Sequence, residues 1–289
     1  MGIGSFRQSS GVRGKGPWQN SLNEEYQGLS YTLQCKVNAP SAMNETELMN
    51  GRKRWLVVFV YAVAMAWVEA AVVLYLRQLI GRIEPYQPYP LPPAGILSAV
   101  ELAREAATLV MLLAVGILAG RTWRSRLGYA AVAFGVWDIF YYVFLKAICG
   151  WPHSVMDWDI LFLIPLPWWG PVLAPVLISL LLIVWGTLAS LMEQTRTPVL
   201  ATRVATGLGA AGVALGLWVF MADAITAAPQ GGMAIRNALP RSFHWPLFCG
   251  ALLLMAAPAA QLMWTYFRAA AGLRPRRNKH TAPPGWPGG

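Results

Sequence analysis

Charged side chains are scarce in this chain. They make up 12% of its 289 residues, whereas soluble domains carry about 25%. Hydrophobic residues reach 56% and the mean hydropathy is +0.44. This composition excludes an ordinary soluble domain, and the apolar residues form long blocks that match the ~20 residues needed to cross a bilayer. The sequence therefore predicts an all-α, multi-pass integral membrane protein.

Histidine and cysteine are also rare, with three of each. The chain contains no HExxH motif and no Glu-x-x-His pair, which argues against a zinc protease and a di-iron helix bundle. The cysteines show no metal-ligand spacing, and no serine or cysteine nucleophile signature is present. The sequence leaves one disulfide pairing undecided, that of Cys149 with Cys249, because these two cysteines could lie on the same side of a membrane. The sequence identifies no cofactor.

Acidic residues are fewer than basic ones, 13 against 23, which gives a net charge of +10. The basic residues do not indicate nucleic-acid binding, because most of them lie in short flanks between apolar blocks, where they set membrane topology. Positive-inside counting predicts a cytoplasmic (inner) membrane protein with both termini in the cytoplasm. The flanking residues on the predicted cytoplasmic side are Arg52, Lys53, Arg54, Arg121, Arg124, Arg126, Arg196, Arg203, Arg268, Arg274, Arg276, Arg277 and Lys279.

Three regions are expected along the chain. Residues 1–50 form a polar tail predicted to be disordered, and Met43 is a candidate for the true start. Residues 51–270 form a six-helix transmembrane domain, and residues 271–289 a basic, Pro/Gly-rich cytoplasmic tail. The predicted membrane segments are 55–80, 97–119, 127–149, 171–192, 204–225 and 243–267.

The segment DWDILFLIPLPWWGP, residues 157–171, is apolar but too short and too rich in proline to cross a bilayer. It predicts an interfacial or re-entrant piece before the fourth helix, with its tryptophans at headgroup level. The triplet WDI occurs at its start and also in the third membrane segment. Asp138 in that segment needs a partner, for which Lys146, Arg104 and Arg77 are candidates, whereas Asp159 is expected to stay wet.

Ionisable residues inside membrane segments are costly and therefore mark functional sites. The first three segments carry such residues in their middle and outer halves, and the spacing of 101, 104, 105 and 108 places one stripe on a single helix face. We expect them to form an outward-facing, ligand-binding pocket made by Glu69, Arg77, Glu101, Arg104, Glu105, Asp138, Tyr142 and Lys146. The expected rim of this pocket is His153, Asp157, Asp159, Asp223 and His244.

Several functions fit this cluster. The first hypothesis is a site that binds, and in one version processes, a small or lipid-like ligand, with membrane lipids as partners. An ion- or proton-coupled transporter is the alternative, although the first three segments show no repeat in the last three. A structural subunit held by a buried ion-pair network is the third reading. Four carboxylates could also hold a divalent cation, although the sequence carries no dedicated metal motif.

Overall fold

The computed structural model describes residues 51–87, 96–191, 202–240 and 242–270. The predicted tails, 1–50 and 271–289, lie outside the described residues. Within these described ranges, six helices are long and apolar enough to cross a membrane, and each corresponds to one predicted segment within a few residues at either end. They are α2 (Gly51–Leu79), α3 (Ile96–Ala119), α4 (Trp123–Cys149), α5 (Leu173–Leu191), α6 (Arg203–Ala227) and α8 (Trp245–Ala270).

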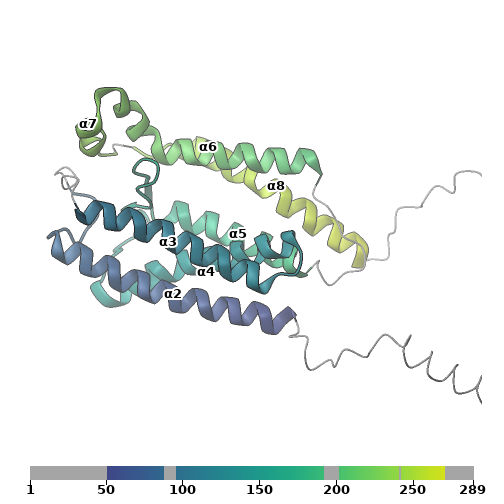
Figure 1. The fold of residues 1–289 in the computed structure, drawn as a ribbon. Coiled ribbons are helices and arrows are strands. Elements are labelled where there is room, and N and C mark those ends of the chain that lie inside the picture. Colours follow the sequence, from purple (N-terminus) through teal and green to yellow (C-terminus); the bar gives the residue numbers. More distant parts are fainter. Residues whose placement is uncertain (1–50, 88–95, 192–201, 241, 271–289) are drawn as a thin grey trace, which may run out of the picture. The chain divides into compact units, whose positions relative to one another are not determined.

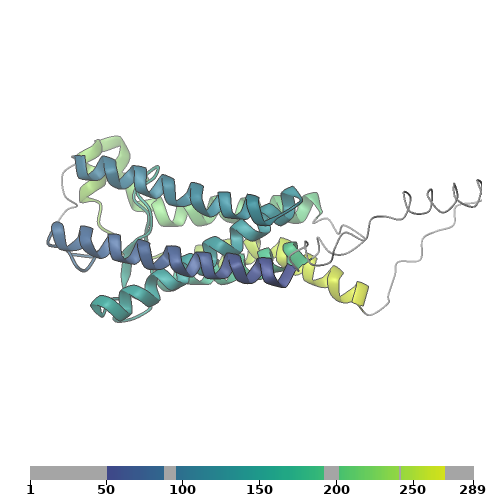
Figure 2. The same cartoon turned by 60° about the horizontal axis from the view of Figure 1, so that its bottom comes forward.

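Helix α4 is the centre of the packing. It lies against α2, α3 and α5, while α6 pairs with α8, which in turn contacts α5 (Figure 1). A two-stranded hairpin connects α4 to α5 and consists of β1 (Trp158–Ile160) and β2 (Trp169–Pro171). A turn of 3₁₀ helix, η2 (Ala228–Gln230), and the short helix α7 (Gly232–Asn237) follow α6. Figure 2 shows the hairpin and α7 at the same end of the helices, which we call the hairpin end.

Small residues let α2 approach α4 closely. Ala62, Ala66 and Ala70 are each 0% exposed, and their spacing of four residues puts them on one face of α2. Ala62 and Ala66 pack with Val132 and Val136 of α4, and Ala70 packs with Leu145 of the same helix. Association of membrane helices depends on such close packing, because lipid tails are as apolar as the side chains that would otherwise drive burial.

The contact between α4 and α5 depends on glycine. A Cβ atom added at Gly186 would lie 2.3 Å from the carbonyl oxygen of Gly128, and one added at Gly135 would lie 2.5 Å from the carbonyl oxygen of Ser179. Both values are below any normal van der Waals contact, so the two backbones approach as closely as they do only because these side chains are absent.

The hairpin is antiparallel, with Asp159 opposite Gly170. Its ladder continues through the amide of Leu161, which donates to the carbonyl of Trp168 at 2.9 Å, and the amide of Trp168, which donates to Phe162 at 2.8 Å. The segment predicted to be interfacial or re-entrant therefore satisfies much of its backbone within itself, as irregular chain at membrane depth must. A Cβ at Gly170 would come within 2.7 Å of the Phe220 ring, so the hairpin lies tightly against α6.

The close approach of α4 and α5 gives a first prediction. We expect Gly186→Ala to lower the free energy of unfolding by about 1–3 kcal/mol, the range for overpacking a tight interface. Gly207→Ala on α6 is the matched control, because nothing lies within 4 Å of its added Cβ. The control should leave the midpoint of thermal unfolding in detergent unchanged or slightly raised. Equal midpoints for the two variants would contradict the glycine contact.

Candidate functional site

The described residues enclose a cavity of about 450 Å³ at the hairpin end. Its walls come from α2, α3, α4, the hairpin and α7. Its lining includes Leu102 and Pro165, which are exposed, so the pocket communicates with the outside of the helix bundle. Seven of the eight residues predicted to bind a ligand line this pocket, namely Glu69, Arg77, Glu101, Arg104, Glu105, Asp138 and Tyr142.

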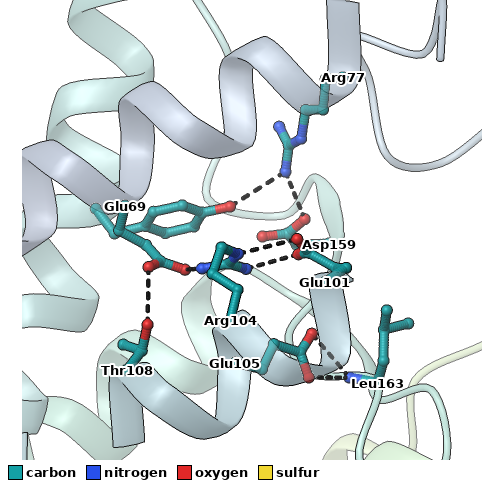
Figure 3. Close-up of polar contacts among 9 residues, drawn as sticks. Glu69, Arg77, Glu101, Arg104, Glu105, Thr108, Asp159 and Leu163 are labelled. Atoms are coloured by element: carbon teal, nitrogen blue, oxygen red, sulfur yellow. Dashed lines mark hydrogen bonds and ion pairs between the residues drawn. The ribbon is translucent and has the colours of Figure 1, made fainter. Parts of the chain in front are cut away.

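Arg104 connects α2 and α3 across the pocket (Figure 3). Its Nη1 donates to Glu69, while its Nε and Nη2 donate to the two carboxylate oxygens of Glu101 at 2.9 and 2.6 Å. Thr108 Oγ1 donates to the second oxygen of Glu69 at 3.3 Å. Three residues of the predicted stripe on α3, Glu101, Arg104 and Thr108, thus form one hydrogen-bonded group with Glu69. In this group a guanidinium fork meets a carboxylate in the bidentate geometry that it favours.

Arg77 holds the hairpin against α2 and α4. Its Nη2 donates to Asp159 Oδ1 at 3.0 Å and to Tyr141 Oη at 3.3 Å, and its guanidinium lies 4.3 Å from the centre of the Trp151 ring. Both members of the ion pair are buried, with 9% and 1% of their side chains exposed. Burial raises the pKa of Asp159, and the Arg77 guanidinium opposes that rise because it favours the carboxylate.

The buried position of Asp159 corrects the expectation that it stays wet at the pocket mouth. The reason is the register of the hairpin, which turns this side chain inward from β1 toward α2. A three-residue strand has one side chain pointing opposite to its two neighbours, and here Asp159 is buried while Trp158 and Ile160 are half-buried. Asp159 therefore belongs to the pocket wall and is absent from its rim.

Asp138 has a different partner from those expected. Ser179 Oγ of α5 donates to its Oδ2 at 2.8 Å, and no basic side chain among the described residues forms an ion pair with it. Lys146 does not line the pocket. It is exposed near the end of α4, where its Nζ donates to the carbonyl of Gly150 at 3.0 Å. Eight residues separate it from Asp138, so the two side chains are about 80° apart around the helix.

Glu105 ties the tip of the hairpin to α3. Its two carboxylate oxygens accept from the backbone amide of Leu163 at 3.2 and 3.0 Å (Figure 3). The side chain is 6% exposed and lines the pocket beside Arg104. It forms no ion pair within 4 Å among the described residues. The hairpin is consequently fixed at its base by Arg77 and at its tip by Glu105.

The other predicted rim residues lie outside the pocket lining. His153 and Asp157 form a local group in the chain before β1, where Asp157 Oδ2 accepts from the His153 amide at 2.7 Å. The His153 ring contacts Glu84 at 3.3 Å, and both side chains are exposed. His244 stacks on Trp218, and Asp223 is half-buried on α6. These four residues do not belong to the described lining, and their place at a rim of the pocket stays a prediction.

In the part of the chain that the structure describes, no three His, Cys, Asp or Glu side chains are grouped to hold a metal ion. The pocket carboxylates instead face guanidinium groups, a backbone amide and a hydroxyl. Cys149 and Cys249 are both free, so the disulfide left open by the sequence is not formed.

Sequence reasoning missed several parts of the site. Arg82 lines the pocket from the turn after α2, and Trp137 and Phe162 supply aromatic walls. Ser179 is an inconspicuous serine in a highly apolar segment, yet it is 0% exposed and hydrogen-bonded to Asp138. A lone hydroxyl inside a membrane segment is the signal that could have found it, because such groups hydrogen-bond across helices.

No family model, curated protein or solved structure matches this chain.

The buried pair of Arg77 and Asp159 gives a second prediction. Asp159→Asn keeps the shape of the side chain but leaves the Arg77 charge buried without its carboxylate. We expect the free energy of unfolding to fall by about 3 kcal/mol, the low end for breaking a buried pair. Glu84→Gln is the control, because the exposed pair with His153 is worth less than about 1 kcal/mol. Thermal or denaturant unfolding in detergent measures both, and a loss no larger than that of the control would refute the buried pair.

Proposed function

We propose that this multi-pass membrane protein binds a small, lipid-like ligand in the pocket between α2, α3, α4 and the hairpin. The observation that carries the proposal is a cavity of about 450 Å³ that combines charged groups with apolar walls between membrane-length helices. Ligand pockets in proteins have volumes of about 300–1,000 Å³ and pair a mostly apolar lining with a few polar groups. This cavity has both properties.

The lining has a polar part and an apolar part. Glu69, Arg104 and Glu105 come from the facing sides of α2 and α3, whereas leucines from α2, α3 and the hairpin supply the apolar wall. A ligand with a polar head and an alkyl portion satisfies both parts at once. The apolar lining residues include Val73, Leu76, Leu102, Leu161, Leu163 and Leu166.

The unequal pairing of charges favours binding over a purely structural network. A network that served only to hold helices together would leave each carboxylate against a basic side chain, because an unpaired buried charge is destabilising. Arg77 and Arg104 do pair with Asp159, Glu69 and Glu101. Glu105 and Asp138 instead meet an amide and a hydroxyl, and both border an open cavity.

An apolar core favours binding over transport. A second, smaller cavity of about 190 Å³ lies at the opposite end, lined among others by Trp55, Tyr129 and Thr187. Between the two cavities along α2 and α4 lie buried apolar residues, including Ala62, Ala66, Val132, Ala133 and Val136. A transport route would need polar groups at this depth. The observation therefore supports a pocket closed toward the end where α2 begins.

In this proposal the pocket faces away from the cytoplasm and the hairpin lies at the membrane interface. The support is the distribution of basic residues, since Arg52, Lys53 and Arg54 begin α2 and Arg121, Arg124 and Arg126 surround the start of α4, at the end opposite the hairpin. Basic flanks of this kind stay in the cytoplasm. Both termini are then cytoplasmic.

This topology predicts which introduced thiols an impermeant reagent reaches. In a background with Cys35, Cys149 and Cys249 replaced by serine, Ser154→Cys at the hairpin end should react in intact cells. Trp123→Cys at the opposite end should react only after the membrane is opened, and both native positions are exposed in the structure. Labelling in the reverse pattern would overturn the orientation while leaving the pocket untouched.

Blocking the pocket tests the binding function itself. We expect Leu102→Trp to fill the opening of the cavity and to abolish retention of lipid-like molecules, measured by native mass spectrometry with lipid analysis of the purified protein. Leu113→Trp is the matched control, because it adds the same bulk to an exposed leucine of α3 outside the pocket lining. Equal retention by wild type and both variants, or none by the wild type, would contradict the proposal.

A further inference from the structure

Among the residues that the structure describes, the pocket lining carries more acid than base. Three of its guanidinium groups are described, those of Arg77, Arg82 and Arg104. Five carboxylates are described as well, namely Glu69, Glu101, Glu105, Asp138 and Asp159. With every one of these groups ionised, together they carry an excess of two negative charges. Burial of an uncompensated charge is strongly unfavourable, so a ligand that supplies positive charge would stabilise this arrangement.

The arginines of the pocket are already engaged. Arg104 uses three donor nitrogens on Glu69 and Glu101, and Arg77 is committed to Asp159 and Tyr141. Arg82 donates to the backbone carbonyls of Pro85 and Gln87. An anionic head group would have to displace the carboxylates from Arg77 and Arg104, or these carbonyls from Arg82, to reach a guanidinium. The excess of charge and its distribution thus disfavour a phosphate or carboxylate ligand.

The other two pocket carboxylates are those of Glu105 and Asp138. Among the described residues, no basic side chain lies within ion-pairing distance of either one. Asp138 is 7% exposed and Glu105 is 6% exposed, so neither is neutralised by bulk water in the way a surface acid would be. The single side-chain hydrogen bond of Asp138 comes from Ser179, and Glu105 receives one backbone amide. Among the described residues, these are the two pocket carboxylates that lack a basic partner, so a positively charged ligand can pair with them.

Aromatic rings complete this part of the wall. Trp137, Tyr141, Tyr142 and Phe162 all line the pocket, and Trp137 stacks on Tyr141 with their ring centres 6.4 Å apart. The negative faces of such rings attract ammonium groups, and aromatic walls beside carboxylates are the usual way in which proteins recognise alkylated amines. The rings also exclude water, which strengthens the attraction between a bound cation and Asp138.

We propose that the ligand of this pocket is a cationic amphiphile, an alkylammonium head with an apolar chain, whose head lies among Glu105, Asp138 and the aromatic residues. The inference rests on the proposed binding function and adds the charge of the ligand to it. A bare metal ion is a poorer occupant, because no three potential ligands are grouped among the described residues. The apolar remainder of the lining receives the alkyl chain.

Three probes with the same alkyl chain test the charge. Dodecyltrimethylammonium, dodecanol and dodecyl phosphate are titrated onto the purified full chain in a maltoside detergent, which brings no competing choline head group, and binding is read by native mass spectrometry. The cationic probe should bind at least tenfold more tightly than dodecanol, and dodecyl phosphate should bind most weakly. Tetramethylammonium has the same head group without the alkyl chain, so it separates a lipid-like ligand from a free amine. Tighter binding of dodecyltrimethylammonium than of tetramethylammonium assigns the ligand to a lipid-like molecule, and equal binding of the two assigns it to a free amine.

Substitutions then locate the charge. Asp138→Asn and Glu105→Gln should each weaken the cationic probe about tenfold and leave dodecanol unchanged, and the second variant serves if the first fails to fold. Glu84→Gln, an exposed acid outside the pocket, is the matched control and should bind all probes as wild type does. Unchanged binding of the cationic probe by both pocket variants would overturn the inference.

The failure of this inference differs from failure of the proposed function. If all three dodecyl probes bind the wild type equally and Leu102→Trp weakens each of them, the pocket binds amphiphiles without regard to charge, and the cationic preference is refuted alone. If Leu102→Trp weakens none of them, the pocket is not the binding site and the proposed function falls with it.

Discussion

The position of the hairpin depends on the buried ion pair between Arg77 and Asp159. A carboxylate and a guanidinium buried as these two are would each be unstable alone, and together they are favourable only with good geometry and further hydrogen bonds. Arg77 has these in Tyr141 and in the face of Trp151. Because the pair joins α2 to β1 while Tyr141 belongs to α4, it sets the distance between the walls of the pocket. The other charged side chains of the pocket lie around this ion pair.

The helices of this chain are readable from its sequence, and so is much of the pocket. Long apolar blocks locate six helices because a membrane span must satisfy its backbone internally, which leaves the helix as the only form for a single apolar segment. Helical periodicity places the stripe of Glu101, Arg104, Glu105 and Thr108 on one face of α3, and all four residues line the pocket. Glu69 joins it because α2 and α3 run in opposite directions and bring their charged levels together.

The errors concern residues whose neighbours are set by tertiary packing. Asp159 was assigned to water because the sequence before α5 shows no register, yet a shift of one residue in a strand exchanges its inner and outer side chains. Lys146 is one of three candidate partners that depth suggests for Asp138, although its angle around α4 places it on the exposed side. Ser179 was overlooked because nothing in its own segment indicates which neighbour its hydroxyl meets. In each of these cases the partner of the side chain is set by contacts between different helices and strands, and not by the secondary-structure propensity of its own segment.

The contact of Gly170 with Phe220 connects the pocket wall to α6 through the hairpin. One strand presents Asp159 to the pocket, and the other rests on α6 so closely that a single methyl group would not fit between them. Helix α6 is paired with α8 and has little other contact with the helices that bear the charges. A displacement of β1 would therefore be passed to α6 through β2. The described parts of α6 and α8, which do not line the pocket, thus have their position coupled to the pocket wall by the packing of Gly170.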